Sequence, residues 1–381
     1  MYIKNLNPII DCCMKRFRHF VSKIGLSIIS LIIILLVLEI TFRFKAFSED
    51  TKGIHALKDI EHNINDLQGE NSLRHIIRLS NHPRIIYELI PNLSVLFFGE
   101  SLKTNSDGFR APQYSKQKNS GTIRIVGLGD SFMFGWRISH NECYLSLLEK
   151  NMKRNFPYVS WEVINTAVPG YNSVMEMETL KAKGLQYDPD LVVIHYVGND
   201  IDLPNFIRKK ENYLTMKKSY LLKFILYRLR GDTRRVKDPL VPAPHHSVER
   251  RFENDPDRVP DEYKDMVGKD AYYRAMKELK ALSLKHGFEL LVVSLQAPNY
   301  VKETCSLINV PIIETIQKIN HFMESHGIEQ YVGSVLTISK EDPHPSALGH
   351  RIIADCIFEY LKKSGLILKF TKSKGEFKLQ L

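Results

Sequence analysis

The sequence predicts an α/β protein with a parallel sheet covered by helices on both faces, preceded by one membrane-spanning helix. Two observations support this. From residue 121 onward, short apolar runs alternate with helical patterns, and the runs end in polar turns. Near the N-terminus, residues 24–38 are almost purely aliphatic, as expected of a helix that crosses a bilayer.

The composition is that of a globular protein. The chain has 381 residues, of which 44% are hydrophobic and 25% charged, which excludes a mainly disordered or collagen-like protein. The net charge is +10, but the excess of bases lies in residues 1–23, 208–237 and 362–381. The main body is therefore slightly acidic, and we expect no nucleic-acid partner. The cysteines number only 5 and are scattered, so a disulfide scaffold is not expected.

The N-terminal region predicts a signal anchor. Residues 1–23 form a basic tail, and residues 24–42 are long enough to span a bilayer. Glu39 lies near the far end of the span, and Arg43 follows four residues later on the same helical face. The positive-inside rule places the N-terminus in the cytoplasm and the rest of the chain outside it, in the periplasm or extracellular space. A cleaved signal peptide is the alternative, but no small-residue cleavage site follows the apolar run.

The remaining chain divides by composition. Residues 43–120 are mixed and polar, and we expect a juxtamembrane stalk that packs as irregular structure on the main body. Residues 121–365 carry the α/β pattern, interrupted by a helical insertion at about 201–268. Residues 366–381 form a basic tail that we expect to be flexible.

Strand and helix patterns alternate within the α/β region. Strands are expected at 123–128, 161–164, 191–196 and 289–294. Helices are expected at about 142–154, 173–185, 271–286, 312–324 and 347–363, and a short apolar run occupies 331–338. Because ligands of such folds bind beyond the carboxyl ends of the strands, the residues that follow the strands are the candidates for chemistry.

Residues suited to acyl transfer stand at these positions. Ser131 follows the first strand, Gly170 the second and Asn199 the third, while His344 precedes the last helix. A serine hydroxyl becomes a nucleophile when a base takes its proton, and a histidine can be that base. The backbone N–H groups of Ser131 and Gly170 and the side-chain amide of Asn199 can supply the donors that an oxyanion needs.

A carboxylate close to His344 completes the set. Asp342 and His344 each precede a proline, which favours an extended backbone at both positions. Residues i and i+2 of an extended chain point to the same side. Asp342 is therefore the favoured partner for orienting the imidazole.

Taken together, these residues resemble a known family. The segments Gly129-Asp130-Ser131, Gly170, Gly198-Asn199-Asp200 and Asp342-Pro343-His344 are similar in order and placement to the four blocks of the SGNH, or GDSL, hydrolases. The resemblance covers about residues 121–363. It implies a flavodoxin-like three-layer α/β/α sandwich with Ser131 as nucleophile, His344 as base, and Ser131, Gly170 and Asn199 as the oxyanion hole. It also implies activity on esters, with no metal and no cofactor.

Two positions depart from the family pattern. Phe132 stands where many members have leucine, which should alter only the packing beside the nucleophile. The acid often lies three residues before the histidine, which here is Glu341, so Asp342 and Glu341 both remain candidates. Residues 104–110 and 344–350 also resemble anchored bacterial members linked to cell-surface polysaccharide.

The resulting hypothesis is a membrane-anchored SGNH-type serine esterase. It would cleave carboxylic esters, such as an O-acyl or acetyl group on an extracytoplasmic glycan or a lipid. One alternative is an O-acyltransferase that uses the same triad on cell-surface polysaccharide. Another is a non-catalytic subunit for glycan binding or assembly. A metal site at His245 and His246 is not expected, since no third ligand has suitable spacing.

The basic insertion permits several interpretations. Apolar residues at 221, 222, 224–226 and 229 are interleaved with bases at 217, 218, 223, 228 and 230. The insertion could be a helix packed over the rim of the active site with a solvated basic face. It could instead lie on anionic lipid or steer an acidic glycan.

Overall fold

The computed structural model describes residues 7–52, 72–208, 214, 219–230, 240–243 and 258–373. The chain forms two compact units, and each is described by itself. One unit comprises Met1–His55 with Lys210–Lys237, and the other comprises Ala56–Lys209 with Asp238–Leu381.

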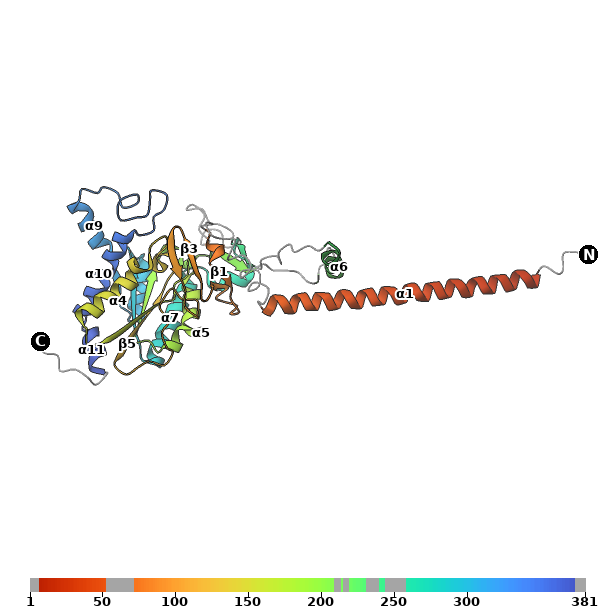
Figure 1. The fold of residues 1–381 in the computed structure, drawn as a ribbon, viewed down its shortest axis with the longest axis horizontal. Helices are drawn as coiled ribbons and strands as arrows, with labels where there is room; N and C mark the ends of the chain where they lie inside the picture. The colour runs from red at the N-terminus through yellow and green to blue at the C-terminus, as the bar shows by residue number, and fades with distance from the viewer. Residues whose placement is uncertain are drawn as a thin grey trace, which may run out of the picture. The chain divides into compact units, whose positions relative to one another are not determined.

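The larger unit is built on a five-stranded parallel sheet (Figure 1). Its strands are β5 (Thr122–Leu128), β6 (Ser160–Asn165), β7 (Leu191–Tyr196), β10 (Glu289–Ser294) and β11 (Ile312–Glu314). Their spatial order is β6-β5-β7-β10-β11, which is the flavodoxin-like order 2-1-3-4-5. The predicted fold class is thus confirmed.

The central strands form because both of their faces are covered. Every residue of β5 and β7 is buried, which explains why their sequences are continuous apolar runs rather than alternating ones. The helices form two layers, since α4 packs against α10, and α5 packs against α7. This arrangement is the one expected of right-handed crossovers, because the chain moves in one direction across the sheet from β5 to β6 and in the opposite direction from β6 onward.

The helices of this unit are α3 (Ser131–Phe134), α4 (Tyr144–Asn155), α5 (Ser173–Ala182), α7 (Lys269–His286), α8 (Asn299–Leu307), α9 (Ile316–Ser325), α10 (Ala347–Lys363) and α11 (Leu366–Ser373). The helices α4, α5, α7 and α10 lie close to where the sequence predicts them, but α11 occupies the start of the tail that was expected to be flexible, because Ile367 and Phe370 are buried. Another difference concerns 312–324, which was expected to be a single helix. Its first three residues instead form β11, and α9 begins at Ile316. A three-residue strand is too short to leave a periodic pattern.

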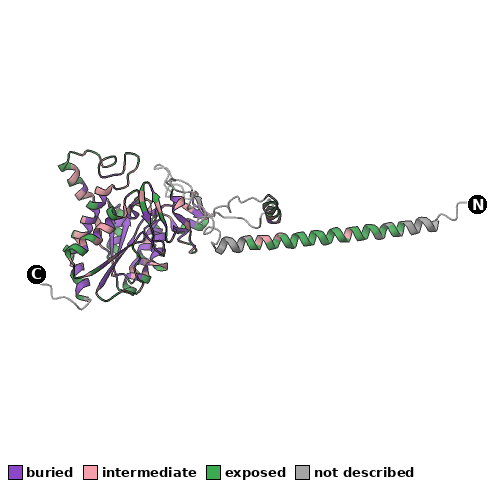
Figure 2. Cartoon of the chain, viewed as in Figure 1, coloured by how far each residue is buried: buried purple, intermediate pink, exposed green. Residues whose placement is uncertain are grey.

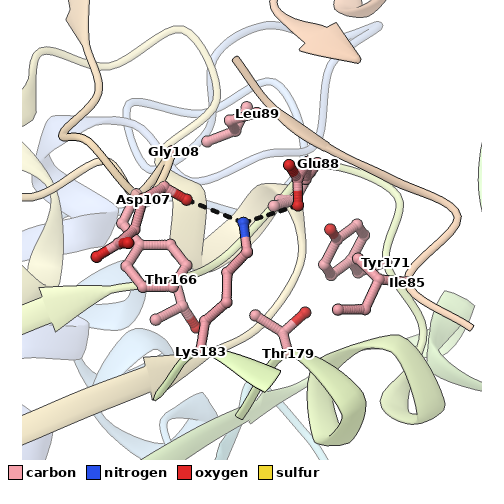
Figure 3. Close-up of a pocket in the computed structure, with 11 residues that line it drawn as sticks. Ile85, Glu88, Leu89, Asp107, Gly108, Thr166, Tyr171, Thr179 and Lys183 are labelled. Carbon is pink, nitrogen blue, oxygen red and sulfur yellow. Dashed lines mark hydrogen bonds and ion pairs between the residues drawn. The ribbon is translucent and has the colours of Figure 1, made fainter. Parts of the chain in front are cut away.

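Residues 72–111 contain four short strands where the sequence predicts irregular structure. The strands β1 (Ile77–Leu79) and β2 (Tyr87–Leu89) pair antiparallel, as do β3 (Ser94–Phe97) and β4 (Glu100–Lys103). Figure 3 shows how Lys183 fastens this segment to the end of α5. Its ammonium donates to Glu88 Oε2 at 2.7 Å and to the carbonyl oxygen of Asp107 at 3.0 Å. The segment is thus bonded to the same unit that carries the sheet.

The smaller unit contains two helices. The long helix α1 (Asn7–Lys52) includes the apolar stretch Phe20–Lys45, which is long and apolar enough to cross a membrane and whose most apolar part is not buried. Figure 2 shows this stretch as almost entirely exposed. The helix α6 (Tyr220–Arg230) packs against α1. It lies in the segment that leaves the larger unit after β8 (Phe206–Arg208) and returns at β9 (Leu240–Pro242).

Candidate active site

Ser131 lies at the point where β5 gives way to α3. Asp130 caps this short helix, since its carboxylate accepts the backbone N–H of Phe132 at 2.9 Å. Gly129 precedes it because the turn is crowded. A Cβ at this position would come within 2.7 Å of Met133 Cβ. The sequence Gly-Asp-Ser thus places the serine hydroxyl at the carboxyl end of the central strand.

His344 joins Ser131 to Asp342. Its Nε2 lies 2.7 Å from Ser131 Oγ, and its Nδ1 lies 2.5 Å from Asp342 Oδ1. Each nitrogen of the imidazole ring therefore has a partner, the serine hydroxyl on one side and the aspartate carboxylate on the other. This arrangement allows the imidazole to accept the serine proton while the carboxylate stabilises the imidazolium that forms.

The carboxylate at the ring belongs to Asp342, while Glu341 accepts the hydroxyl of Ser339 at 3.0 Å. Partial burial opposes ionisation of Asp342, but hydrogen bonds from the ring and backbone N–H of His344 outweigh it. The pKa of Asp342 is therefore lower than usual. Arg137 adds a further donor at 3.4 Å from Asp342 Oδ2. Asp342 thus carries the charge that an orienting acid needs.

The three expected oxyanion donors lie on three different strand ends. Within the described part of the chain, the backbone N–H groups of Ser131 and Gly170 make no recorded hydrogen bond. Gly170 has φ +77°, a conformation that favours glycine, and a Cβ there would meet the Asn205 side chain at 2.4 Å. Asn199 donates from Nδ2 to Asp130 Oδ2 at 3.1 Å. A carboxamide has two N–H groups, so one remains for a substrate oxygen.

Aromatic rings surround the relay. The His344 ring lies 5.0 Å from the Phe132 ring and 5.9 Å from the Trp136 ring, measured between centroids. Trp136 in turn packs against Phe98 at 5.2 Å, from the turn between β3 and β4. Phe132, the departure from the family pattern, thus packs beside the histidine. These rings line one side of the His344 ring.

Arg110 holds the backbone that follows Ser131, a role that the sequence did not reveal. This buried guanidinium donates to the carbonyl oxygens of Phe134 and Gly135, both at 2.7 Å, and of Ile138 at 2.5 Å. These carbonyls end α3 and begin the loop that carries Trp136 and Arg137. A cation at the carboxyl end of a helix satisfies its otherwise unpaired carbonyls. A single arginine far upstream leaves no periodic signal by which to find it.

Two buried histidines below the site have structural partners. Burial lowers the pKa of His195 to about 4, so this histidine is neutral at pH 7, and its Nδ1 pairs with the Tyr144 hydroxyl at 2.9 Å. The Nδ1 of His350, also buried, accepts the backbone N–H of Tyr144 at 3.2 Å. These two histidines brace the residues that follow β5. Burial also raises the pKa of Glu176 well above its usual value, as it does for Asp200.

Among the residues that the structure describes, no group of three or more histidine, cysteine, aspartate or glutamate side chains could hold a metal ion. His245 and His246 lie outside the described residues.

Comparison with solved structures gives distant likenesses. TesA shares 14% identity over 64% of this chain and 98% of its own, with a TM-score of 0.37. The acetyl xylan esterase AlAXEase shares 13% over 63% of this chain and 100% of its own, with a TM-score of 0.39. A catalytic mutant of Axe2, an acetylxylan esterase from Geobacillus stearothermophilus, shares 14% identity over 64% of this chain and 95% of its own, with a TM-score of 0.39.

The sequence comparisons are more direct. No curated protein sequence matches the chain. Residues 128–271 match the model of the GDSL-like lipase/acylhydrolase family, and this match begins one strand residue before the Gly-Asp-Ser turn. The chain therefore carries a domain of the GDSL-like lipase/acylhydrolase family and is an ester-hydrolysing enzyme.

Proposed function

We propose that the chain is a membrane-anchored serine esterase that removes O-acyl groups, in particular acetyl groups, from a glycan outside the cytoplasm. The observation that carries the proposal is the continuous relay from Ser131 Oγ through His344 to Asp342, with separations of 2.7 and 2.5 Å. Distances of this size allow direct proton transfer without rearrangement.

Each residue has one task in the proposed reaction. Ser131 Oγ attacks the ester carbonyl as His344 Nε2 takes its proton, and the oxygen of the carbonyl becomes an oxyanion. The N–H groups of Ser131 and Gly170 and the amide of Asn199 stabilise that charge. His344 then gives the proton to the departing sugar oxygen, which leaves an acyl group on Ser131. Water, activated by the same imidazole, releases the acid and restores the serine.

The location and the substrate class rest on two further observations. The exposed apolar stretch of α1 follows a basic tail, which favours an anchor with the catalytic domain on the extracytoplasmic side. The aromatic rings of Trp136 and Phe98 beside the relay are only partly buried. Such rings suit the apolar faces of sugar rings, and the compact wall they form beside His344 suits a short acyl group.

The test uses the full chain in detergent micelles. Hydrolysis of p-nitrophenyl acetate is compared with that of the octanoate ester, for the wild type, for Ser131→Ala and for Ser325→Ala. Ser325 is an exposed serine at the end of α9 and serves as the matched control. We expect loss of about 10³-fold or more in kcat for Ser131→Ala, full activity for Ser325→Ala, and preference for acetate.

Other outcomes would redirect the proposal. Equal rates for the wild type and Ser131→Ala would refute the assigned nucleophile. Slow hydrolysis that becomes rapid acyl transfer when oligosaccharides are added would identify an acyltransferase with the same relay. Preference for the octanoate ester would indicate that the substrate is a lipid ester and not an acetylated glycan.

A further inference from the structure

We propose that α6 is an interfacial helix: its exposed apolar stripe enters the lipid surface, its bases bind anionic phospholipid headgroups, and Glu39 of α1 fixes its first turn at the end of the membrane span. The inference rests on the anchor in the proposed function and extends it. It explains two features that catalysis leaves unused, an acidic residue within an apolar span and a basic insertion in the hydrolase domain.

Glu39 receives the amino end of α6. Its carboxylate accepts the backbone N–H of Tyr220 at 2.9 Å, the backbone N–H of Leu221 at 2.9 Å and the hydroxyl of Ser219 at 2.8 Å. Arg43 Nε donates to the same carboxylate at 2.8 Å. A helix begins with unpaired N–H groups and a partial positive charge, and a carboxylate satisfies both. Glu39 is thus fully engaged, which removes the cost of an unpaired acid near a membrane.

Aromatic contacts extend this junction along one face of α1. Phe42 stacks on Phe224 with the ring centroids 4.4 Å apart, and the Arg43 guanidinium lies over the Tyr220 ring at 5.3 Å. Glu39, Phe42 and Arg43 stand at positions i, i+3 and i+4, so a single helical face makes all of these contacts. Two helices joined by a cap, a ring stack and a cation–π contact have a defined relative placement within the smaller unit.

A second face of α6 is apolar and exposed. Leu222, Ile225 and Leu226 are 54%, 41% and 37% exposed, and helical spacing places them on one stripe. The stripe is distinct from the face of Tyr220 and Phe224 that meets α1. Leucine and isoleucine gathered on one side of a helix indicate a surface that is covered in the cell.

Lipid is the occupant that the neighbouring residues favour. The contacts of Glu39 join α6 to the same helix that exposes Leu36, Val37 and Ile40 on either side of Glu39. A helix held at that level lies at the boundary between hydrocarbon and headgroups. The apolar stripe then continues the surface that the span itself presents to lipid.

The sequence of α6 and of the residues just before it supplies the charge that such a surface requires. Bases stand at 217, 218, 223, 228 and 230, with no acid between 212 and 231. A sequence in which bases alternate with apolar residues is typical of helices that bind anionic membranes.

This placement gives the hydrolase domain a second tether. The chain enters the insertion after Arg208 and leaves it at Leu240, so α6 is bound covalently to the larger unit on both sides.

The test measures where α6 lies in lipid. The full chain, with Cys12→Ser and Cys13→Ser, is placed in nanodiscs of phosphatidylcholine with or without phosphatidylglycerol; the described remaining cysteines are buried. An environment-sensitive dye is attached at Leu222→Cys, at Ile32→Cys within the span, or at Leu284→Cys, an exposed position of α7. Quenching by lipid-borne doxyl groups and by aqueous iodide is recorded for each.

We expect iodide quenching at 222 to be about fivefold weaker than at 284, with strong quenching by shallow doxyl lipids. Removal of phosphatidylglycerol should weaken this protection at least about twofold. Glu39→Ala should make the label at 222 accessible to iodide, while Thr41→Ala, an exposed position of the same helix, should not.

Two results would overturn the inference in different ways. A label at 222 that is open to iodide, with the label at 32 still in lipid, would refute the interfacial helix and leave the anchor intact. A label at 32 that is also open to iodide would refute the anchor of the proposed function. Equal protection at 222 in both lipid mixtures would refute the headgroup contact.

Discussion

The two halves of the proposed relay are held in different ways. The serine half is buried and braced by distant parts of the chain: Arg110 holds the end of α3, and Asn165 Nδ2 donates to the Met133 carbonyl at 2.9 Å. The histidine half is a partly exposed loop that is held mainly by its own residues. Within it, Ile338 N–H donates to the His344 carbonyl at 2.9 Å.

Because of this difference, we expect substitutions in the two halves to affect stability and activity differently. Groups that brace the serine half are desolvated, and leaving them unpaired costs folding free energy as well as geometry. Groups that order the histidine loop can still reach water when a contact is lost. Substitutions in the serine half should therefore lower stability and activity together, while those in the histidine loop should lower activity alone.

The largest effect within the histidine loop is expected from Asp342→Asn. An amide at this position can donate to Nδ1, which shifts the ring proton to Nε2 and leaves no lone pair to accept the serine proton. We expect kcat to fall about 10³-fold, with a melting temperature close to that of the wild type. Steady-state hydrolysis and thermal unfolding of the two proteins test both parts.

Glu341→Gln is the matched control, because Glu341 is the neighbouring acid and its carboxylate pairs with Ser339 rather than with the ring. We expect its activity to remain within about twofold of the wild type. A larger loss of activity for Glu341→Gln than for Asp342→Asn would show that Glu341, and not Asp342, orients the imidazole.

The serine half should respond differently, and Arg110→Met tests this. The substitution leaves the carbonyls of Phe134, Gly135 and Ile138 without their donor in a buried site. We expect a loss of about 3 kcal/mol in the free energy of unfolding and a fall of about 10-fold in kcat, since the loop after the nucleophile shifts. Denaturant titration and initial rates at a temperature well below the unfolding transition measure the two effects.

Arg351→Met provides the comparison, because Arg351 is an exposed arginine of α10. It should change neither quantity appreciably. If Arg110→Met lost activity while keeping its stability, the serine half would not be braced in the manner inferred from its hydrogen bonds.

A smaller effect is expected from Ser339→Ala. Ser339 Oγ accepts the backbone N–H of Asp342 at 3.1 Å and of Glu341 at 3.2 Å. Without it the turn before His344 has more freedom, and we expect kcat to fall about fivefold with no change in stability. Ser334→Ala, in the same loop but without a recorded contact to Asp342, is the control. A drop in melting temperature for Ser339→Ala would remove the distinction between the two halves.

The same contrast explains which features could be predicted from the sequence. The chain reveals Ser131 because a buried strand, a tight turn and a cap are local patterns, and it reveals Asp342 with His344 because two prolines impose an extended backbone. The strands β5 and β7 are continuous apolar runs, and their parallel pairing follows from the helices between them. Local chemistry and periodicity are readable without coordinates.

Long-range pairings were not readable. Arg110 contacts Phe134 across 24 positions of sequence, and Glu39 contacts Tyr220 across 181. The strand β11 has only three residues, and its apolar residues cannot be told apart in the sequence from those of α9, which begins two residues later. These features depend on what the fold brings together, so a single sequence contains the residues but not their partners.

The smallest expected effect concerns Glu176, which lies on α5 in the buried region below the serine half. Its two carboxylate oxygens have no hydrogen-bond partner among the described residues, and burial raises its pKa well above the usual value. The folded protein thus keeps this proton at a pH where the unfolded chain, with a pKa of about 4.3, has released it. Because the unfolded state then binds fewer protons, stability must fall as the pH rises above about 4.3.

Replacing the acid by an apolar side chain should remove that dependence. We expect Glu176→Met to gain about 1 kcal/mol in the free energy of unfolding at pH 7, more at pH 8 and less at pH 5, with kcat unchanged. Denaturant titrations at these three pH values measure the gain, and Glu303→Met, at an exposed position of α8, supplies the baseline. A gain that is independent of pH would mean that the carboxyl group is not protonated in the fold. A loss of kcat at constant stability would mean that the serine half depends on this acid directly, and that burial there serves the relay rather than only the core.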